Sequence, residues 1–123
     1  MDWKIELLAV PVADIDRAKE FYVKIGFTAD HDHTVDENTR FVQLTPPGSA
    51  CSIVLDLNFS GMKPGDVKGI QCVVADADAA LAQLVAVGVD AGAVDETPWG
   101  RFVHFSDPDG NAWALQQLVP YES

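Results

Sequence analysis

Histidine is the side chain best suited to proton transfer near neutral pH, and this sequence has three. His104 lies in the apolar run 102–106, where the two-residue period of a strand places Phe102 and His104 on one face. A neutral imidazole there can act as a general base without a metal, or can contact a ligand. The alternative is a hydrogen-bonded core histidine, and the sequence leaves both interpretations open.

His31 and His33 flank Asp32 and would share one face of a strand. Two imidazoles at this spacing can bind a metal ion, since imidazole suits zinc, copper and nickel. The run that follows, residues 34–38, is polar and typical of a loop. We therefore expect two solvent-facing histidines, and only their spacing favours the metal-binding alternative.

The composition is that of a globular domain with a strong excess of negative charge. Of 123 residues, 48% are hydrophobic and 22% are charged, and the net charge is −11. The basic residues are scattered, so we expect neither a nucleic-acid partner nor a membrane surface, and the acidity favours a neutral or cationic ligand. The sequence has no Gly-rich phosphate loop, nucleophile elbow or paired-cysteine motif, so nothing supports nucleotide binding or acyl-enzyme chemistry.

The two cysteines and the N-terminal residues favour a cytoplasmic location. Cys51 and Cys72 each lie in an apolar, strand-like run, which predicts two buried free thiols in a reducing setting. Residues 1–6 lack the basic flank and apolar stretch of a signal peptide. No run approaches the length of a transmembrane helix, which needs about 18 apolar residues.

The chain contains one internal repeat, in which residues 12–18 match residues 74–80 at an offset of 62. Further identities occur at the same offset between Gly26 and Gly88, Pro46 and Pro108, Gly48 and Gly110, and Ala50 and Ala112. Agreement over half the chain indicates two copies of a unit of about 60 residues. We expect a single domain, 1–123, with module 1 at about 1–58, a linker at 59–66 and module 2 at about 67–119.

Each copy predicts a strand, a helix and then three strands. In the first copy the strands are 5–12, 27–33, 40–45 and 51–57, and the helix begins at Asp14 or Asp16 and ends at Gly26. In the second copy the strands are 69–75, 89–94, 102–106 and 112–118, and the helix covers 78–87 before Gly88.

Several of these features occur together in one known family. They are the paired β-α-β-β-β units, the helix opening with Val12, Asp14, Ala18, Phe21 and Tyr22, the helix stop Gly26-Phe27, and the Asp-Pro-Asp-Gly-Asn turn at 107–111. Over essentially the whole chain, the sequence resembles the vicinal oxygen chelate superfamily, which includes glyoxalase I, bleomycin-resistance proteins and extradiol dioxygenases. The resemblance implies an α+β fold, in which two β-α-β-β-β modules form a cupped, incomplete barrel. It also implies a homodimer, often with sites completed between chains.

Enzymes of that family usually hold a divalent metal through His or Glu side chains on the first and last strands of each module. The resemblance carries these positions onto Leu7, Gly69 (with Gln71 as the alternative register), Ala114, and either Ser52 or Asp56. Leucine, glycine and alanine side chains offer no lone pair to a metal. We therefore expect no metal and no other cofactor, with a divalent metal as the alternative.

The cup that the resemblance implies would bind a small molecule through an apolar wall and a few polar groups. For the wall we predict Leu7, Val54, Phe102, Ala112 and Ala114, with Trp99 in a loop over the opening. For the polar groups we predict Gln43, Ser52, Asp56, Gln71, His104 and Gln116. The alternative is that these side chains only fill the barrel.

Three functions are consistent with these observations. The first is a metal-free protein that sequesters a small, cationic molecule, similar to bleomycin-resistance proteins and hence to antibiotic resistance. The second is a metal-dependent lyase, isomerase or dioxygenase of the same superfamily. The third is a metal-free isomerase or lyase with His104 or Asp56 as the base. We favour the first, which accounts for the missing metal ligands, and the sequence leaves open whether the chain is an enzyme.

Overall fold

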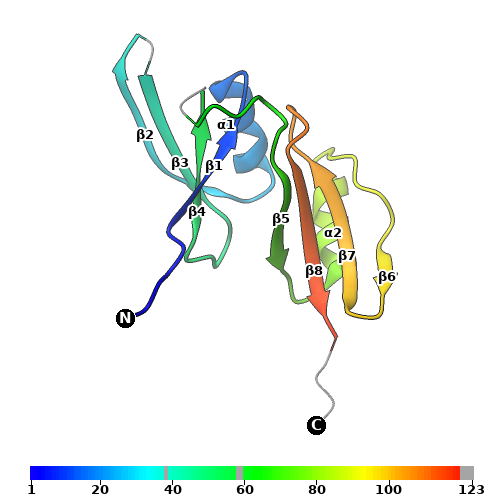
Figure 1. Cartoon of the computed structure of the whole chain (residues 1–123). Helices are drawn as coiled ribbons and strands as arrows, with labels where there is room; N and C mark the ends of the chain where they lie inside the picture. The colour runs from blue at the N-terminus through cyan, green and yellow to red at the C-terminus, as the bar shows by residue number, and fades with distance from the viewer. Residues whose placement is uncertain (38, 58–59, 120–123) are drawn as a thin grey trace. The chain divides into compact units, whose positions relative to one another are not determined.

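The computed structural model describes residues 1–37, 39–57 and 60–119 (Figure 1). The predicted boundary between module 1 and the linker, at 58 and 59, lies outside the described residues, as do residues 120–123 of the predicted domain. The chain forms two compact units, and each is described by itself. The first is Met1–Val67 with Pro108–Asn111, and the second is Lys68–Asp107 with Ala112–Ser123.

The first unit has one helix and a four-stranded mixed sheet. Its elements are β1 (Leu7–Pro11), α1 (Ile15–Lys24), β2 (Thr28–Asp36), β3 (Thr39–Thr45) and β4 (Ser52–Asp56). The strand order is β1-β4-β3-β2, with β1 parallel to β4 and the other pairs antiparallel. The predicted β-α-β-β-β order of the first copy is confirmed.

The second unit repeats this topology. Its elements are β5 (Lys68–Val73), α2 (Ala77–Ala86), β6 (Asp95–Thr97), β7 (Gly100–Ser106) and β8 (Ala112–Leu118). The strand order is β5-β8-β7-β6, with β5 parallel to β8. The predicted α+β class, built from two β-α-β-β-β modules, is therefore confirmed.

The two helices begin and end through the same chemistry. Asp14 and Asp76 have extended backbone and cap α1 and α2, each accepting a hydrogen bond of 3.1 Å from the backbone N–H three residues on. Gly26 and Gly88 follow the helices with φ of +115° and +84°, a region that favours glycine. Asp14 rather than Asp16 is thus the first cap, and both predicted glycine stops are confirmed.

One face of each sheet packs on its helix. In the first unit, α1 contacts β3 and β4, and the fully buried side chains include Val10, Val42, Leu44 and Tyr22. Alternate residues of the same strands point away from α1. We call this the first distal face; it is formed by Leu7, Ala9, Phe41, Gln43, Ser52, Val54 and Asp56.

Two predicted elements differ from the structure. The strand predicted at 89–94 is wrong, because that segment has no regular structure and the strand is β6 (Asp95–Thr97). The segment contains Gly92 and two alanines, whereas Thr97 donates a hydrogen bond of 2.7 Å to the Gly100 carbonyl and closes the β6–β7 hairpin. The loop expected after His33 is also wrong, because β2 continues to Asp36 and pairs with β3.

The Asp-Pro-Asp-Gly-Asn turn holds the first unit together. Asn111 is fully buried; its side-chain amide donates to the Pro11 carbonyl at 2.8 Å and accepts from the Val67 N–H at 3.2 Å. Asp109 accepts hydrogen bonds from the Ala13 N–H and the Arg17 guanidinium. The bond from Asn111 to Pro11 is buried, and together the four bonds tie the turn to the first unit, so the motif has a structural role.

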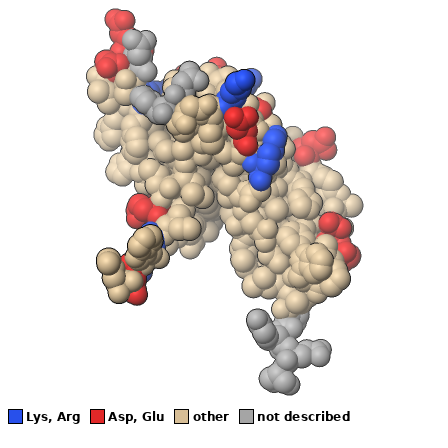
Figure 2. Space-filling model, in the orientation of Figure 1, with Lys and Arg blue, Asp and Glu red and all other residues tan. Residues whose placement is uncertain are grey.

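The basic side chains are largely tied to acidic ones. All three arginines of the sequence form ion pairs, and on the face drawn in Figure 2 basic side chains lie beside acidic ones. Cys51 and Cys72 are free thiols, as predicted, but both are half-buried rather than buried. Within the described part of the chain, no helix is long and apolar enough to cross a membrane.

Candidate ligand-binding site

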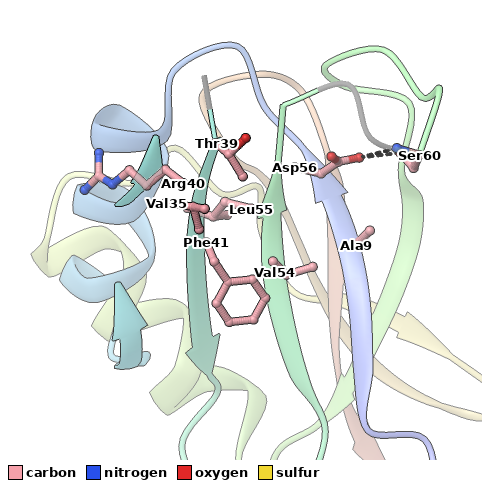
Figure 3. Close-up of a pocket in the computed structure, with 9 residues that line it drawn as sticks. All are labelled: Ala9, Val35, Thr39, Arg40, Phe41, Val54, Leu55, Asp56 and Ser60. Carbon is pink, nitrogen blue, oxygen red and sulfur yellow. Dashed lines mark hydrogen bonds between the residues drawn. The ribbon is translucent and has the colours of Figure 1, made fainter. Parts of the chain in front are cut away.

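A hollow of about 460 Å³ lies on the first distal face (Figure 3). Its lining residues are Ala9, Val35, Thr39, Arg40, Phe41, Val54, Leu55, Asp56 and Ser60. The volume falls within the range of about 300–1,000 Å³ that is usual for small-molecule sites. All four strands of the first sheet contribute to this lining, so its geometry follows from the register of the sheet.

The centre of the hollow is apolar. The parallel register places Ala9 beside Val54, and Phe41 projects from the neighbouring strand β3. In Figure 3, the Phe41 ring and the Val54 side chain lie near one another. This wall offers an aromatic surface and aliphatic contacts to a ligand.

One end of the hollow is polar. Asp56 is 4% exposed, and its Oδ2 accepts hydrogen bonds from the Ser60 N–H at 3.0 Å and from the Ser60 hydroxyl. The carboxylate therefore fixes the chain that follows β4. The sequence-predicted Asp56 does line the hollow, but these bonds give it a structural task there.

Leu7, Gln43 and Ser52, also predicted as ligand residues, belong to the same face but not to the lining of the hollow. The hydrogen bonds of Thr45 determine whether the Ser52 hydroxyl acts as a donor or as an acceptor. The Thr45 hydroxyl donates to the Asp30 carboxylate, so the Ser52 hydroxyl donates to Thr45 Oγ1, 2.6 Å away. Ser52 is therefore left as a hydrogen-bond acceptor.

The other predicted ligand residues belong to the second unit. The rings of Phe102 and His104 are nearly parallel at a centroid distance of 5.9 Å. The His104 side chain is 60% exposed, with Nε2 3.9 Å from an Asp95 carboxylate oxygen. The core interpretation of His104 is thus wrong, because its side chain is exposed, although Phe102 on the same face is buried.

Ala114 and two glutamines share the face of Phe102 and His104. Ala114 is the Cα partner of both His104 and Gln71. Gln116 is buried, accepts a hydrogen bond from the Gln71 amide, and donates one of 3.0 Å to the Trp99 carbonyl. The structure thus brings the predicted residues of the second unit together, with Trp99 exposed in the β6–β7 turn.

The strand register also places the metal positions that the family resemblance implies. Leu7 pairs with Ser52, and Ala114 pairs with Gln71. The pairing favours Gln71 over Gly69, which lies at a register irregularity with φ of +121°.

These side chains do not fit a divalent transition ion. Leu7 and Ala114 supply no donor atom, and the Gln71 amide is bonded to Gln116. Nowhere among residues 1–37, 39–57 and 60–119 do three His, Cys, Asp or Glu side chains form a metal-binding group.

Sequence reasoning missed seven residues that line the hollow: Ala9, Val35, Thr39, Arg40, Phe41, Leu55 and Ser60. The signal for Phe41 was present, because it lies two residues before Gln43 in a predicted strand and so shares its face. Val35 lies within the run 34–38 that was interpreted as a loop, and Thr39 follows that run directly. Ser60 lies in the predicted linker, where its bond to Asp56 has no periodic signature.

Comparison with known proteins identifies the family. The model of the Glyoxalase/Bleomycin resistance protein/Dioxygenase superfamily matches residues 4–115. The antibiotic binding protein TnmS3 from Streptomyces sp. CB03234 is 39% identical, with 96% of this chain and 98% of that chain covered and a TM-score of 0.87. A glyoxalase/bleomycin resistance protein from the same organism is 40% identical, with 93% and 100% covered and a TM-score of 0.82.

A bacterial relative extends this comparison. The uncharacterized protein YetH of Bacillus subtilis (strain 168) is 27% identical, and the match covers 93% of this chain and 98% of YetH. Both structural matches and YetH align over nearly their whole lengths. This chain therefore belongs to the glyoxalase/bleomycin resistance protein/dioxygenase superfamily.

Proposed function

We propose that this chain binds and sequesters a small organic molecule of the antibiotic type, in the hollow of the first distal face. The observation that carries the proposal is the hollow itself, with its apolar wall of Ala9, Phe41 and Val54. Apolar sites with few polar groups hold small organic ligands through burial of their apolar surface. Binding of this kind needs no metal at the family's ligand positions.

The relatives support the same function. TnmS3 is described as an antibiotic binding protein, and its identity of 39% extends over nearly all of this chain. The residues at the family's metal positions, Leu7, Ser52, Gln71 and Ala114, suit contact with a ligand better than coordination of an ion.

The polar groups beside the hollow favour a ligand that donates hydrogen bonds. Ser52 is an acceptor because its proton is directed to Thr45, and Asp56 is a carboxylate at the edge of the hollow. The net charge of −11 attracts cations over longer range. We therefore propose a ligand with an apolar, preferably aromatic body and a hydroxyl or amine donor.

Binding is tested by titrating the protein with a panel of aromatic antibiotics that pairs amine-bearing members with neutral ones. A true ligand should saturate one site in isothermal titration calorimetry. At a hundredfold excess over Kd it should stabilise the fold by about 2.7 kcal/mol. The ligand should be recovered unchanged by mass spectrometry after prolonged incubation. Turnover of the ligand would favour an enzyme instead.

Filling the hollow should abolish this binding. Val54→Trp places a large ring beside Phe41, so we expect affinity for the panel ligand to fall at least tenfold while the unliganded protein stays folded by circular dichroism. Val85→Trp is the matched control, because Val85 is 59% exposed on α2. Unchanged affinity in Val54→Trp would place the ligand elsewhere.

A further inference from the structure

Two histidines lie next to one another on an edge strand of the first sheet. His31 and His33 occupy alternate positions of β2, and their ring centroids are 5.9 Å apart with an interplanar angle of 25°. Both side chains are exposed. Val35, two residues further along the strand, lines the hollow.

The backbone between the histidines is held in place by Asp32. Its carboxylate accepts hydrogen bonds from Lys19 Nζ at 2.7 Å, from Arg40 Nε at 2.9 Å and from Arg40 Nη2 at 2.8 Å. Arg40 also bonds Asp16 of α1 at 2.6 Å. These bonds anchor the part of β2 that lies between the two histidines.

The surroundings of the pair tolerate a cation. The Cα partners across the ladder are Gln43 for His31 and Phe41 for His33, and neither is charged. The positive charges of Lys19 and Arg40 are paired with Asp32, the residue between the two histidines. The excess of acidic residues over the whole chain further favours cation binding.

We propose that His31 and His33 together bind one divalent transition-metal ion, with Cu²⁺ preferred to Ni²⁺. Imidazole nitrogen is a good ligand for both ions, and Cu²⁺ binds such sites more strongly. Rotation about the side-chain bonds of two adjacent rings brings one nitrogen of each toward a common ion, while the anchored backbone limits the entropy lost. Two protein ligands leave further coordination positions open to water or to a donor atom of another molecule.

The test uses the untagged full-length chain and the metal ions alone. Copper chloride is titrated calorimetrically into the wild type, His31→Asn, His33→Asn and His104→Asn, and retention on a nickel-charged chelating resin is compared. His104→Asn is the matched control, because His104 is an exposed histidine on β7, in the other unit. We expect one copper per chain in the wild type, at least a tenfold loss of affinity in either pair variant, and no loss in the control.

The electron paramagnetic resonance spectrum of bound Cu²⁺ gives an independent readout. The wild type should show coupling to two imidazole nitrogens, and each pair variant should lose one. Wild-type protein without stoichiometric binding, or pair variants that bind like the wild type, would overturn the proposal. Val54→Trp should still bind copper, which separates failure of this site from failure of the proposed function.

Discussion

The Asp32 side chain links three elements of the first unit through its ion pairs with Lys19 and Arg40. It lies on β2, Lys19 on α1 and Arg40 on β3, and its own carboxylate is 26% exposed. The Arg40 guanidinium approaches it through two nitrogens, a geometry that is stronger and more specific than a single ion pair. The pKa of Arg40 is correspondingly raised by its bonds to Asp32 and Asp16.

Replacing Asp32 should therefore destabilise the first unit. We expect Asp32→Asn to lower the free energy of unfolding by about 1–2 kcal/mol, since it removes charge-assisted bonds at a partly buried site. Urea denaturation at pH 7 measures this loss. Asp16→Asn is the control, because Asp16 is 81% exposed and bonded once to Arg40, so a clearly smaller loss is expected. Equal losses would refute the special role of Asp32.

The same carboxylate predicts a pH dependence of stability. Its pKa is lower in the folded state than in the unfolded state, so the unfolded chain binds the proton more tightly. The stabilisation is complete at pH values above the ordinary Asp pKa of about 4 and is lost as the pH falls below it. Thermal melts from pH 6 to pH 3 should show a larger drop for the wild type than for Asp32→Asn.

Single residues differ in how far the sequence predicts them. The caps Asp14 and Asp76 follow from local rules, because a capping carboxylate bonds to a backbone three residues away. The pairing of Asp32 with Arg40 depends on the register between β2 and β3, which no local pattern supplies. The stacking of His31 on His33 likewise depends on β2 continuing beyond both residues, which the sequence did not predict.

At the scale of elements, the β6–β7 hairpin depends on Gly100. This residue has φ of +151°, and a Cβ there would lie 2.8 Å from the Gln117 carbonyl oxygen and 3.0 Å from Gln116 Nε2. Gln116 in turn donates a hydrogen bond to the Trp99 carbonyl. The close packing of Gly100 against Gln116 therefore sets the position of the exposed Trp99.

Gly100→Ala should strain this hairpin and displace Trp99. We expect a loss of about 1–3 kcal/mol in unfolding free energy and a shift of tryptophan fluorescence, because both backbone and side chain must move. Gly92→Ala is the matched control, since a Cβ there meets no atom within 4 Å. A Gly100→Ala protein as stable as the control would show that the hairpin does not need this glycine.

The elements that the sequence predicts best are those with strong periodicity and capping. Both helices and the strands β3, β4, β7 and β8 were predicted within a few residues. The prediction of a strand at 89–94 was wrong because its central residues, Ala91, Gly92 and Ala93, have small side chains that pack poorly in a sheet. β2 was predicted too short because residues 34–36, two of them polar, pair with β3, which lies further along the chain.

At the scale of the whole molecule, the internal repeat extends to its ion pairs. Arg40 bonds Asp16 in the first turn of α1, and Arg101 bonds Asp78 in the first turn of α2. The hydrogen bonds from Arg101 lower the pKa of Asp78. The repeat is visible in the sequence, whereas the hollow on the first distal face depends on how the strand register places Phe41, Val54 and Ala9.

The predicted site residues are divided between the two units, and the structure brings together those within each unit. The homodimer and the cytoplasmic location remain predictions. The whole-molecule claim is that a small organic ligand binds without a metal at the family's positions. The histidine pair complicates any simple metal analysis, because copper or nickel retained by His31 and His33 would imitate a family metal site.

One measurement tests the central claim most directly. The double variant His31→Asn/His33→Asn is stripped with a chelator, and the panel antibiotic is titrated into it calorimetrically with and without added Zn²⁺, Ni²⁺, Mn²⁺ or Fe²⁺. We predict one saturable site whose affinity changes less than about twofold on adding any metal, a difference well below 1 kcal/mol. Binding that disappears in the chelated protein and returns with one of these ions would contradict the account.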